Sequence, residues 1–152
     1  MALPCPASRK DAAHRLALEY TAALVYEPAD VERSITSLAS APGGGLIVCP
    51  DAFTVTHFET INDLAVRNGL PSIYSERNFS ADGALVSYGA DYLDHFRQAA
   101  TYVDRILRGA KPADLPVQQP AKFDLVINLR TAKALGLTVS TSMQLLANEL
   151  IE

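Results

Sequence analysis

Residues 83–116 read GALVSYGADYLDHFRQAATYVDRILRGAKPADLP, and this stretch says more about the fold than any other part of the chain. A short apolar strand at 84–86 leads into a Ser-Tyr-Gly turn at 87–89 and then into one long amphipathic helix. That helix should run from about Asp91 to Arg108 and end at Gly109 and Pro112. Backbone donors and small side chains at a strand-to-helix turn are where α/β proteins hold ligands, so this turn is the first candidate for a binding site.

Working outward from this stretch, strands and helices alternate in units of about 25–30 residues. The other predicted strands cover residues 18–26, 46–49, 71–75 and 123–129, and residues 78–83 read as a polar loop. Further helices are also predicted. The first of them ends near residue 17, the second begins at Pro28, and the third ends at Asn68. The last two cover residues 131–135 and 142–151. The alternation predicts an α/β fold whose sheet is mainly parallel and carries helices on both faces.

Apolar residues at helical spacing predict which side of each helix faces the core. In the order of the helices, they are Val31, Ile35, Leu38 and Ala39, then Phe58, Ile61, Leu64 and Ala65, then Phe96, Ala99, Ala100, Val103, Ile106 and Leu107.

Composition narrows the classes of protein to which the chain can belong. Its 152 residues are 49% hydrophobic and 20% charged, which is the composition of one globular domain. The net charge of −4 offers no basic face for a phosphate backbone, so nucleic acid is not an expected partner. The apolar runs are far shorter than the roughly 18 residues of a membrane span, and the first ten residues lack the apolar core of a secretory signal. As written, the chain is expected in the cytoplasm.

Metal and cofactor sites are not expected. The two cysteines, Cys5 and Cys49, have no metal-ligand spacing, and the three histidines lie on different predicted helices. Gly43, Gly44 and Gly45 precede their strand, whereas phosphate-binding glycines follow one. Neither a nucleophile elbow nor a hydrolase triad is present, so we expect no catalytic residues.

The first group of candidate ligand-binding residues follows two buried strands. Asp51 directly follows one of them, with Phe53 and Thr54 beside it, and Ser75 ends the next strand. Open α/β sheets gather ligand groups at this edge. Asp51 could pair with an amine or accept from a hydroxyl, but Asp51 or Thr54 could equally serve only as the helix cap.

The second group of candidates is Ser87, Tyr88 and Gly89. Together they would offer a hydroxyl, an aromatic face and an unobstructed backbone N–H, which suit an aromatic or zwitterionic ligand. The alternative is that Tyr88 only packs at a hinge and Gly89 only relaxes the turn.

Several further motifs carry a family resemblance. They are GGLIV at 44–48 with Pro50 and Asp51, LPSIY at 70–74, SYG at 87–89, YVDRILRGAKP at 102–112, and Lys122 with Phe123 through Asn128 to KALGL at 133–137. With these motifs the chain, from about residue 12 onward, resembles the ABC transporter substrate-binding protein family, which is similar to the type I periplasmic binding proteins. The resemblance implies two α/β lobes that hold a small molecule, such as an amino acid, in the cleft between them without catalysis. It also implies an ABC permease as partner and a periplasmic or membrane-anchored extracellular location for the family.

The resemblance further implies that the chain is the C-terminal half of such a protein. Residues 12–86 would form part of the second lobe, and residues 87–152 would form the hinge crossing, the long helix and a C-terminal strand and helix that pack on the missing first lobe. The strand at 123–129 would then be an exposed edge beside an apolar face. We therefore expect weak ligand binding and a tendency to form a homodimer through that face.

Two alternatives stay open. One is a flavodoxin-like receiver or enzyme module that uses Asp51 as its reactive group. The other is a truncated gene product without activity.

Overall fold

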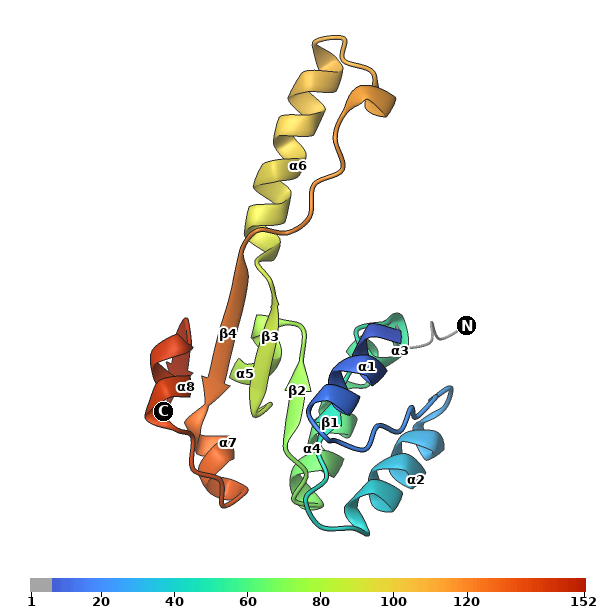
Figure 1. Cartoon of the computed structure of the whole chain (residues 1–152), viewed down its shortest axis with the longest axis vertical. Coiled ribbons are helices and arrows are strands. Elements are labelled where there is room, and N and C mark those ends of the chain that lie inside the picture. Colours follow the sequence, from blue (N-terminus) through green and yellow to red (C-terminus); the bar gives the residue numbers. More distant parts are fainter. Residues whose placement is uncertain (1–6) are drawn as a thin grey trace.

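The computed structural model describes residues 7–152, and one five-stranded sheet draws strands from both halves of the chain (Figure 1). The strands lie in the order of the sequence: β1 (Leu46–Ile47), β2 (Ser72–Tyr74), β3 (Val86–Ala90), β4 (Phe123–Asn128) and β5 (Glu149–Ile151). β1, β2 and β3 are parallel, β4 is antiparallel to β3, and β5 is parallel to β4. The prediction of an α/β fold with a mainly parallel sheet is confirmed.

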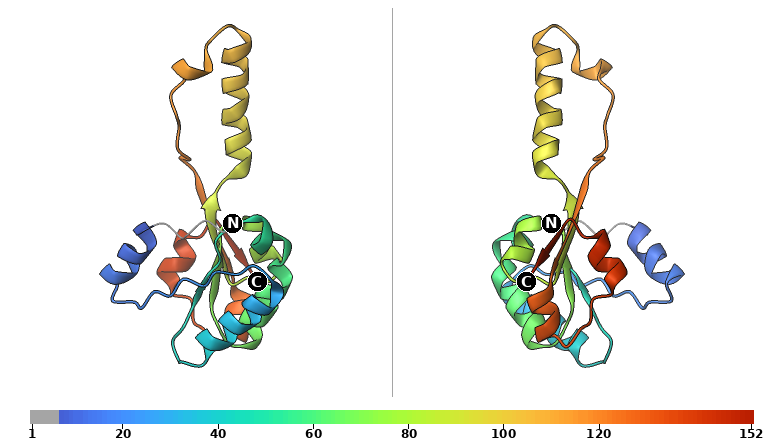
Figure 2. Two further views of the ribbon diagram at one scale, coloured as in Figure 1. Left: turned by 90° about the vertical axis from the view of Figure 1, so that its right-hand side faces the viewer. Right: turned by 90° about the vertical axis from the view of Figure 1, so that its left-hand side faces the viewer.

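Helices lie on both sides of the sheet. They are α1 (Ala7–Arg15), α2 (Pro28–Ala39), α3 (Ala52–Thr56), α4 (Phe58–Arg67), α5 (Arg77–Ala81), α6 (Tyr92–Leu107), α7 (Leu129–Ala134) and α8 (Thr141–Leu146), with a 3₁₀ turn at Pro112–Asp114. Figure 2 shows α2, α4 and α5 on one side of the sheet and α1 and α8 on the other. No helix among residues 7–152 combines the length and the hydropathy that a bilayer span requires.

The main core lies between the sheet and the side that carries α2 and α4. Val31 and Ile35 of α2 are buried, as are Phe58, Ile61 and Ala65 of α4, so the apolar faces predicted for these two helices are confirmed. Phe58 stacks on Phe79 with ring centroids 4.2 Å apart, and Tyr74 of β2 meets both rings edge-on.

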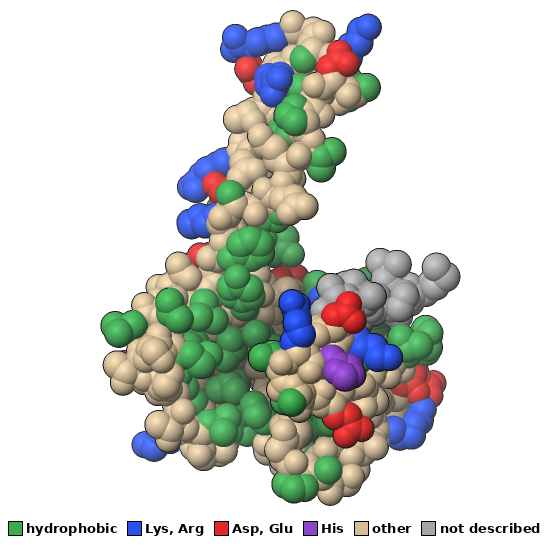
Figure 3. Space-filling view, viewed as in Figure 1, with side chains coloured by type: hydrophobic (Ala, Val, Ile, Leu, Met, Phe, Trp, Pro, Cys, Tyr) green, Lys and Arg blue, Asp and Glu red, His purple; other side chains and the backbone are tan. Residues whose placement is uncertain are grey.

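The opposite face of the sheet is less covered. Side chains alternate along a strand, so the register puts Ile47, Ile73 and Val86 on the face opposite Tyr74. Ile47 of β1 is 61% exposed, and Leu146 of α8, at the other end of the sheet, is 73% exposed. Figure 3 shows hydrophobic side chains gathered in a hollow of the body on this side of the molecule.

Three local predictions are wrong. Residues 18–26 are irregular instead of forming a strand, because no neighbouring strand pairs with them. Residues 78–83 are not only a loop, since α5 forms there and brings Phe79 into the aromatic cluster. The helix predicted at 142–151 ends at Leu146, because the backbone of Asn148 bonds to Leu125 and the last residues pair with β4 as β5.

α6 forms as predicted, but its apolar face is not buried. The helix projects from the sheet as an arm (Figure 1), and none of its 16 residues is buried. Phe96 is 73% exposed and Leu107 is 82% exposed. The apolar spacing therefore predicted the helix correctly and its burial within this chain wrongly.

The root of the arm also differs from the predictions. Ser87, Tyr88 and Gly89 lie inside β3 rather than in a turn. β4 is not an exposed edge, because β3 and β5 flank it on either side. The division into part of a ligand-binding lobe (residues 12–86) and a hinge crossing with the long helix and the C-terminal elements (residues 87–152) stays a prediction. The sheet itself continues across this division through the pairing of β3 with β4.

Candidate functional site

The candidate site is the edge of the sheet at which β1, β2 and β3 end. These strands are parallel and in register, with Ile47 beside Ile73 and Ile73 beside Val86. Asp51 follows β1, Ser75 follows β2, and Tyr88 lies at the same level of β3. The topology therefore brings three of the predicted residues to one edge of the sheet, where open α/β folds gather ligand groups.

Asp51 caps α3, as one of the two interpretations of the sequence proposed. Its Oδ1 accepts from the backbone N–H of Thr54 at 2.8 Å, and its own N–H donates to Thr54 Oγ1 at 3.0 Å. The side chain is nevertheless exposed, and within residues 7–152 its second oxygen, Oδ2, has no hydrogen bond. A cap and a ligand contact are compatible, because each can use a different oxygen.

Thr54 and Phe53 mainly stabilise the structure at this edge of the sheet. The Thr54 hydroxyl donates to the carbonyl oxygen of Cys49 at 2.7 Å, and the residue is only 9% exposed. Phe53 stacks on His57 with ring centroids 4.2 Å apart and packs against the main core. Both residues hold the turn that presents Asp51.

Ser75 and Ser87 carry buried hydroxyls that have no hydrogen-bond partner within residues 7–152. Ser87 lies beside Tyr74 in the register, so its side chain points to the helix-covered face and is fully buried. Ser75 lies just past the end of β2, at the candidate edge. A buried hydroxyl without a partner loses its hydrogen bonds to water, and the Ser75 hydroxyl would regain one from a polar ligand atom that reached it.

Tyr88 points away from Ser87, because neighbouring side chains of a strand alternate between faces. The Tyr88 ring stacks on Phe123 of β4, with centroids 5.6 Å apart and planes 19° apart. The structure thus separates Ser87 from Tyr88, although the sequence suggested that they would act together.

Gly89 lets β3 approach the end of β2. A Cβ atom at this position would lie 1.8 Å from the carbonyl oxygen of Ser75, a distance that no side chain can adopt. The glycine is therefore needed for backbone packing at the candidate edge, whatever else it contacts.

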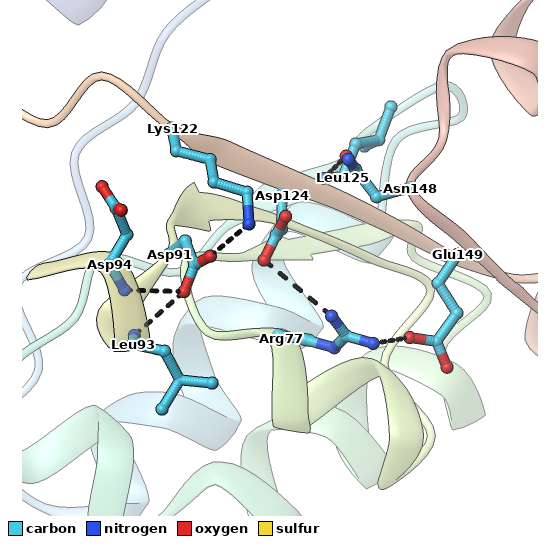
Figure 4. A network of polar contacts seen from close by, with 9 residues as sticks. All are labelled: Arg77, Asp91, Leu93, Asp94, Lys122, Asp124, Leu125, Asn148 and Glu149. Atoms are coloured by element: carbon cyan, nitrogen blue, oxygen red, sulfur yellow. Dashed lines mark hydrogen bonds and ion pairs between the residues drawn. The ribbon is translucent and has the colours of Figure 1, made fainter. Parts of the chain in front are cut away.

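Ion pairs hold the two strands together where the arm leaves the sheet (Figure 4). Asp91 caps α6, and its Oδ2 accepts from Lys122 Nζ at 2.6 Å. The Lys122 hydrogen bond holds the pKa of Asp91 below its ordinary value, and Asp91 in turn raises the pKa of Lys122. Arg77 pairs with Asp124 and Glu149, which ties α5 to β4 and β5.

Sequence reasoning did not select Lys122 or Phe123 as candidates. Lys122 lies 31 residues from Asp91, and Phe123 meets Tyr88 only because β3 and β4 pair. The sequence marked Phe123 only as the start of the strand predicted at 123–129, and the start of a strand does not reveal which side chain it will meet.

Two surface depressions lie elsewhere, on α2 and between α2 and α4. Residues such as Glu32 and Arg33 line them, and no candidate residue does. These two depressions therefore lie away from the carboxyl edge of the sheet.

Three known proteins are similar to this chain in sequence or in structure. A curated protein of Clostridioides difficile (strain R20291), named tyrosine-binding protein, is 30% identical over 108 residues, which are 71% of this chain and 31% of that protein. A solved conserved domain protein from Vibrio cholerae superposes with a TM-score of 0.82 at 27% identity, over 93% of this chain and 47% of the other. A solved ABC domain from Streptococcus pneumonia in complex with L-Trp superposes with a TM-score of 0.82 at 25% identity, over 95% of this chain and 50% of the other.

The chain thus spans about half the length of these solved chains and about a third of the curated relative. The family model described as ABC transporter substrate binding protein matches residues 7–151. Because this match covers almost the whole chain, the protein belongs to the ABC transporter substrate binding protein family.

Proposed function

We propose that this chain forms one wall of the ligand cleft of a solute-binding protein that delivers an amino acid to an ABC permease. Membership of the substrate-binding family supports the binding of a small molecule, and the curated relative is named as a binding protein. The tyrosine-binding relative and the L-Trp complex support an amino acid as the ligand. The chain would hold its ligand without catalysing a reaction.

One observation carries this proposal: the three parallel strands end at one edge with Asp51, Ser75 and Tyr88. Asp51 would bind the ammonium group of an amino acid through Oδ2, while Oδ1 stays in the cap. Ser75 would offer its buried hydroxyl to a polar atom of the ligand. Thr54, Phe53 and Ser87 would shape the wall, and Gly89 would keep β3 close to Ser75.

This wall alone should bind weakly. Ligand sites gain affinity by burying most of the ligand, and two-lobed proteins do so by closing around it. The chain spans about half the length of the solved chains that it resembles, so a second wall would cover the ligand. That wall would come from another part of a longer protein or from a second copy of this chain.

The test is a nuclear magnetic resonance titration of the ¹⁵N-labelled chain with L-Trp and L-Tyr. We expect a dissociation constant on the order of 1 mM or weaker. The backbone amides of residues 49, 51–54, 75–76 and 87–90 should shift, whereas those of α2 should not. Shifts confined to the depressions on α2 and α4 would contradict the proposal.

Two variants separate ligand contact from structure. Asp51→Asn keeps an oxygen for the α3 cap and removes the negative charge, so it should weaken binding without unfolding the helix. Ser75→Ala removes only the orphaned hydroxyl and should also weaken binding. Unchanged affinity in both variants would remove these two residues from the site.

The receiver or enzyme alternative finds less support. Asp51 already uses one carboxylate oxygen in the helix cap, and the named relative is a binding protein.

A further inference from the structure

We infer that α6 is an interaction surface for a second copy of this chain, and that two copies pair their α6 helices antiparallel about a two-fold axis. The inference concerns the arm and does not rest on the proposed function. The surface is the stripe, a row of apolar side chains on one side of α6. Its members are Tyr92, Phe96, Ala99, Ala100, Val103, Ile106 and Leu107.

The stripe is uncovered within residues 7–152, where every one of its members is exposed. Residues 110–122, the return segment, run back beside the helix (Figures 1 and 2). They contact another side of α6, because the Tyr102 hydroxyl donates to the carbonyl oxygen of Pro116. Tyr102 is the neighbour of Val103 in the sequence, and neighbours in a helix point about 100° apart. The chain's own return segment therefore leaves the stripe open to a partner.

The spacing of the stripe fits another helix. Along its centre, the steps from Tyr92 through Phe96, Ala99 and Val103 to Ile106 are four, three, four and three residues. This is the heptad spacing with which two helices pack side by side. The 16 residues of α6 make a helix about 24 Å long, which is enough for several layers of such contacts.

The partner helix that we assign is α6 of a second copy. The helices α2 and α4 bury their apolar faces in the core, and no other helix among the described residues exposes an apolar row of this length. A pair with two-fold symmetry requires a surface that is complementary to itself. The stripe and its flank meet this requirement in shape and in charge.

The shape of the stripe is complementary to itself when the two helices run antiparallel. With the two-fold axis at residue 101, residues equally far before and after it lie level with each other. Phe96 is then level with Ile106 of the second copy, and Val103 is level with its Ala99. Each layer thus combines a larger with a smaller side chain, as close packing of facing positions requires.

Charges beside the stripe complement each other in the same arrangement. Arg97 and Asp104 lie two turns apart on one flank, and antiparallel pairing brings Arg97 of each copy beside Asp104 of the other. Arg97 has no ion pair within residues 7–152. Asp104 bonds to Arg108 through Oδ1 at 2.9 Å, which leaves Oδ2 for a second partner. Parallel helices would instead place equal charges level with each other and align their dipoles unfavourably.

The association should be weak. In the antiparallel pair the two bodies lie at opposite ends of the paired helices, so the helices supply most of the contact. One pair of helices is at the lower end of the areas that specific interfaces bury, so we expect a dissociation constant on the order of 10–100 μM.

The test reverses the charges on the flank and follows the association of the full chain by sedimentation equilibrium. Arg97→Asp would place two carboxylates beside each other, and Asp104→Arg would place two guanidinium groups there. Each single variant should weaken association about tenfold. The double variant Arg97→Asp with Asp104→Arg restores opposite charges and should associate like the unmodified chain.

Arg105→Asp is the matched control. It makes the same change of charge on the side of α6 opposite the stripe, where Arg105 is exposed, so association should stay unchanged. A mixture of the two single variants should associate as tightly as the unmodified chain, because each variant then meets the opposite charge. Circular dichroism checks that all variants fold alike.

Three outcomes would overturn the inference. An unmodified chain that is monomeric at every concentration would mean that a different protein covers the stripe. Single variants that associate as tightly as the unmodified chain would mean that the helices do not pair antiparallel. A double variant as weak as the single ones, or equal weakening by Arg105→Asp, would mean that Arg97 and Asp104 do not meet across the interface. The proposed function stands or falls separately, by the amino acid titration.

Discussion

Single residues at the candidate edge serve the backbone as well as the proposed ligand. Gly89 has no room for a Cβ atom beside Ser75, and Asp51 closes the first turn of α3 with one carboxylate oxygen. The same residues that would contact a ligand thus also stabilise the backbone at the end of β2 and at the start of α3. Stability measurements can separate the two roles.

Gly89→Ala should destabilise the chain by about 2–3 kcal/mol, because either β3 or the end of β2 must move to admit the methyl group. Gly45→Ala is a matched control. Its Cβ would meet the Pro71 carbonyl oxygen at an ordinary 3.5 Å, so its effect should stay within about 0.5 kcal/mol. Urea denaturation measures both, and equal effects would show that the close approach at Gly89 does not matter.

Asp51→Ala should lower the free energy of unfolding by about 1 kcal/mol, because the cap of α3 is lost. Asp51→Asn should stay within about 0.5 kcal/mol of the unmodified chain, since asparagine caps as well as aspartate. The same denaturation experiment measures both variants. If they are equally destabilised, the negative charge and not the cap stabilises this turn.

At the scale of elements, contacts between Asp91 at the end of β3 and Lys122 before β4 hold the base of the arm. The backbone N–H of Asp91 donates to the Lys122 carbonyl oxygen at 3.1 Å, and the two side chains form an ion pair as well. We call these two contacts between Asp91 and Lys122 the clasp. Because α6 has no buried residue, the clasp and the cap of α6 fix the start of the helix on the sheet. The clasp depends on charge and therefore on pH.

The pKa of the Asp91 carboxyl group should lie below its ordinary value of 3.8, first because of the Lys122 hydrogen bond and then because of the cap N–H of Asp94. Its contribution to stability is present above that ordinary value and is lost as the pH falls through the lowered pKa. Lys122→Met should raise the pKa, while the bonds from the cap remain. Carbon-detected titration of the side-chain carboxyl group measures it, and an unchanged pKa in the variant would mean that the ion pair is absent in solution.

At the scale of the whole molecule, the arm exposes an apolar stripe on α6. Phe96, Val103 and Leu107 lie along one side of the helix, and all three are exposed. An apolar stripe of this length is unusual on an isolated monomer. We expect it to pack against another protein surface, either the second wall of the cleft or a second copy of the chain.

Sedimentation velocity should show the chain associating as its concentration rises. The double variant Phe96→Glu with Val103→Glu should remain a monomer at every concentration, because charges on the stripe oppose its burial. Thr101→Glu adds a charge on the other side of α6 and should associate like the unmodified chain. A monomer at all concentrations without any substitution would contradict homodimer formation.

Much of the fold could be predicted from the sequence, because local patterns decide it. The faces of α2 and α4 follow from apolar spacing, and Asp51 could be placed at a strand end and a helix start together. The end of the chain could not be predicted. Residues 149–151 form a strand only because β4 offers its free edge to them.

The sequence alone determined the alternation of strands and helices and the position of Asp51 and Ser75 after two neighbouring strands, since parallel strands in order end on the same side. Only the tertiary structure decided that Ser87 points into the core, that Phe123 stacks on Tyr88, and that α6 stands away from the body. Spacing along a chain specifies which residues share a face. What that face meets depends on pairings between strands that lie far apart in the sequence.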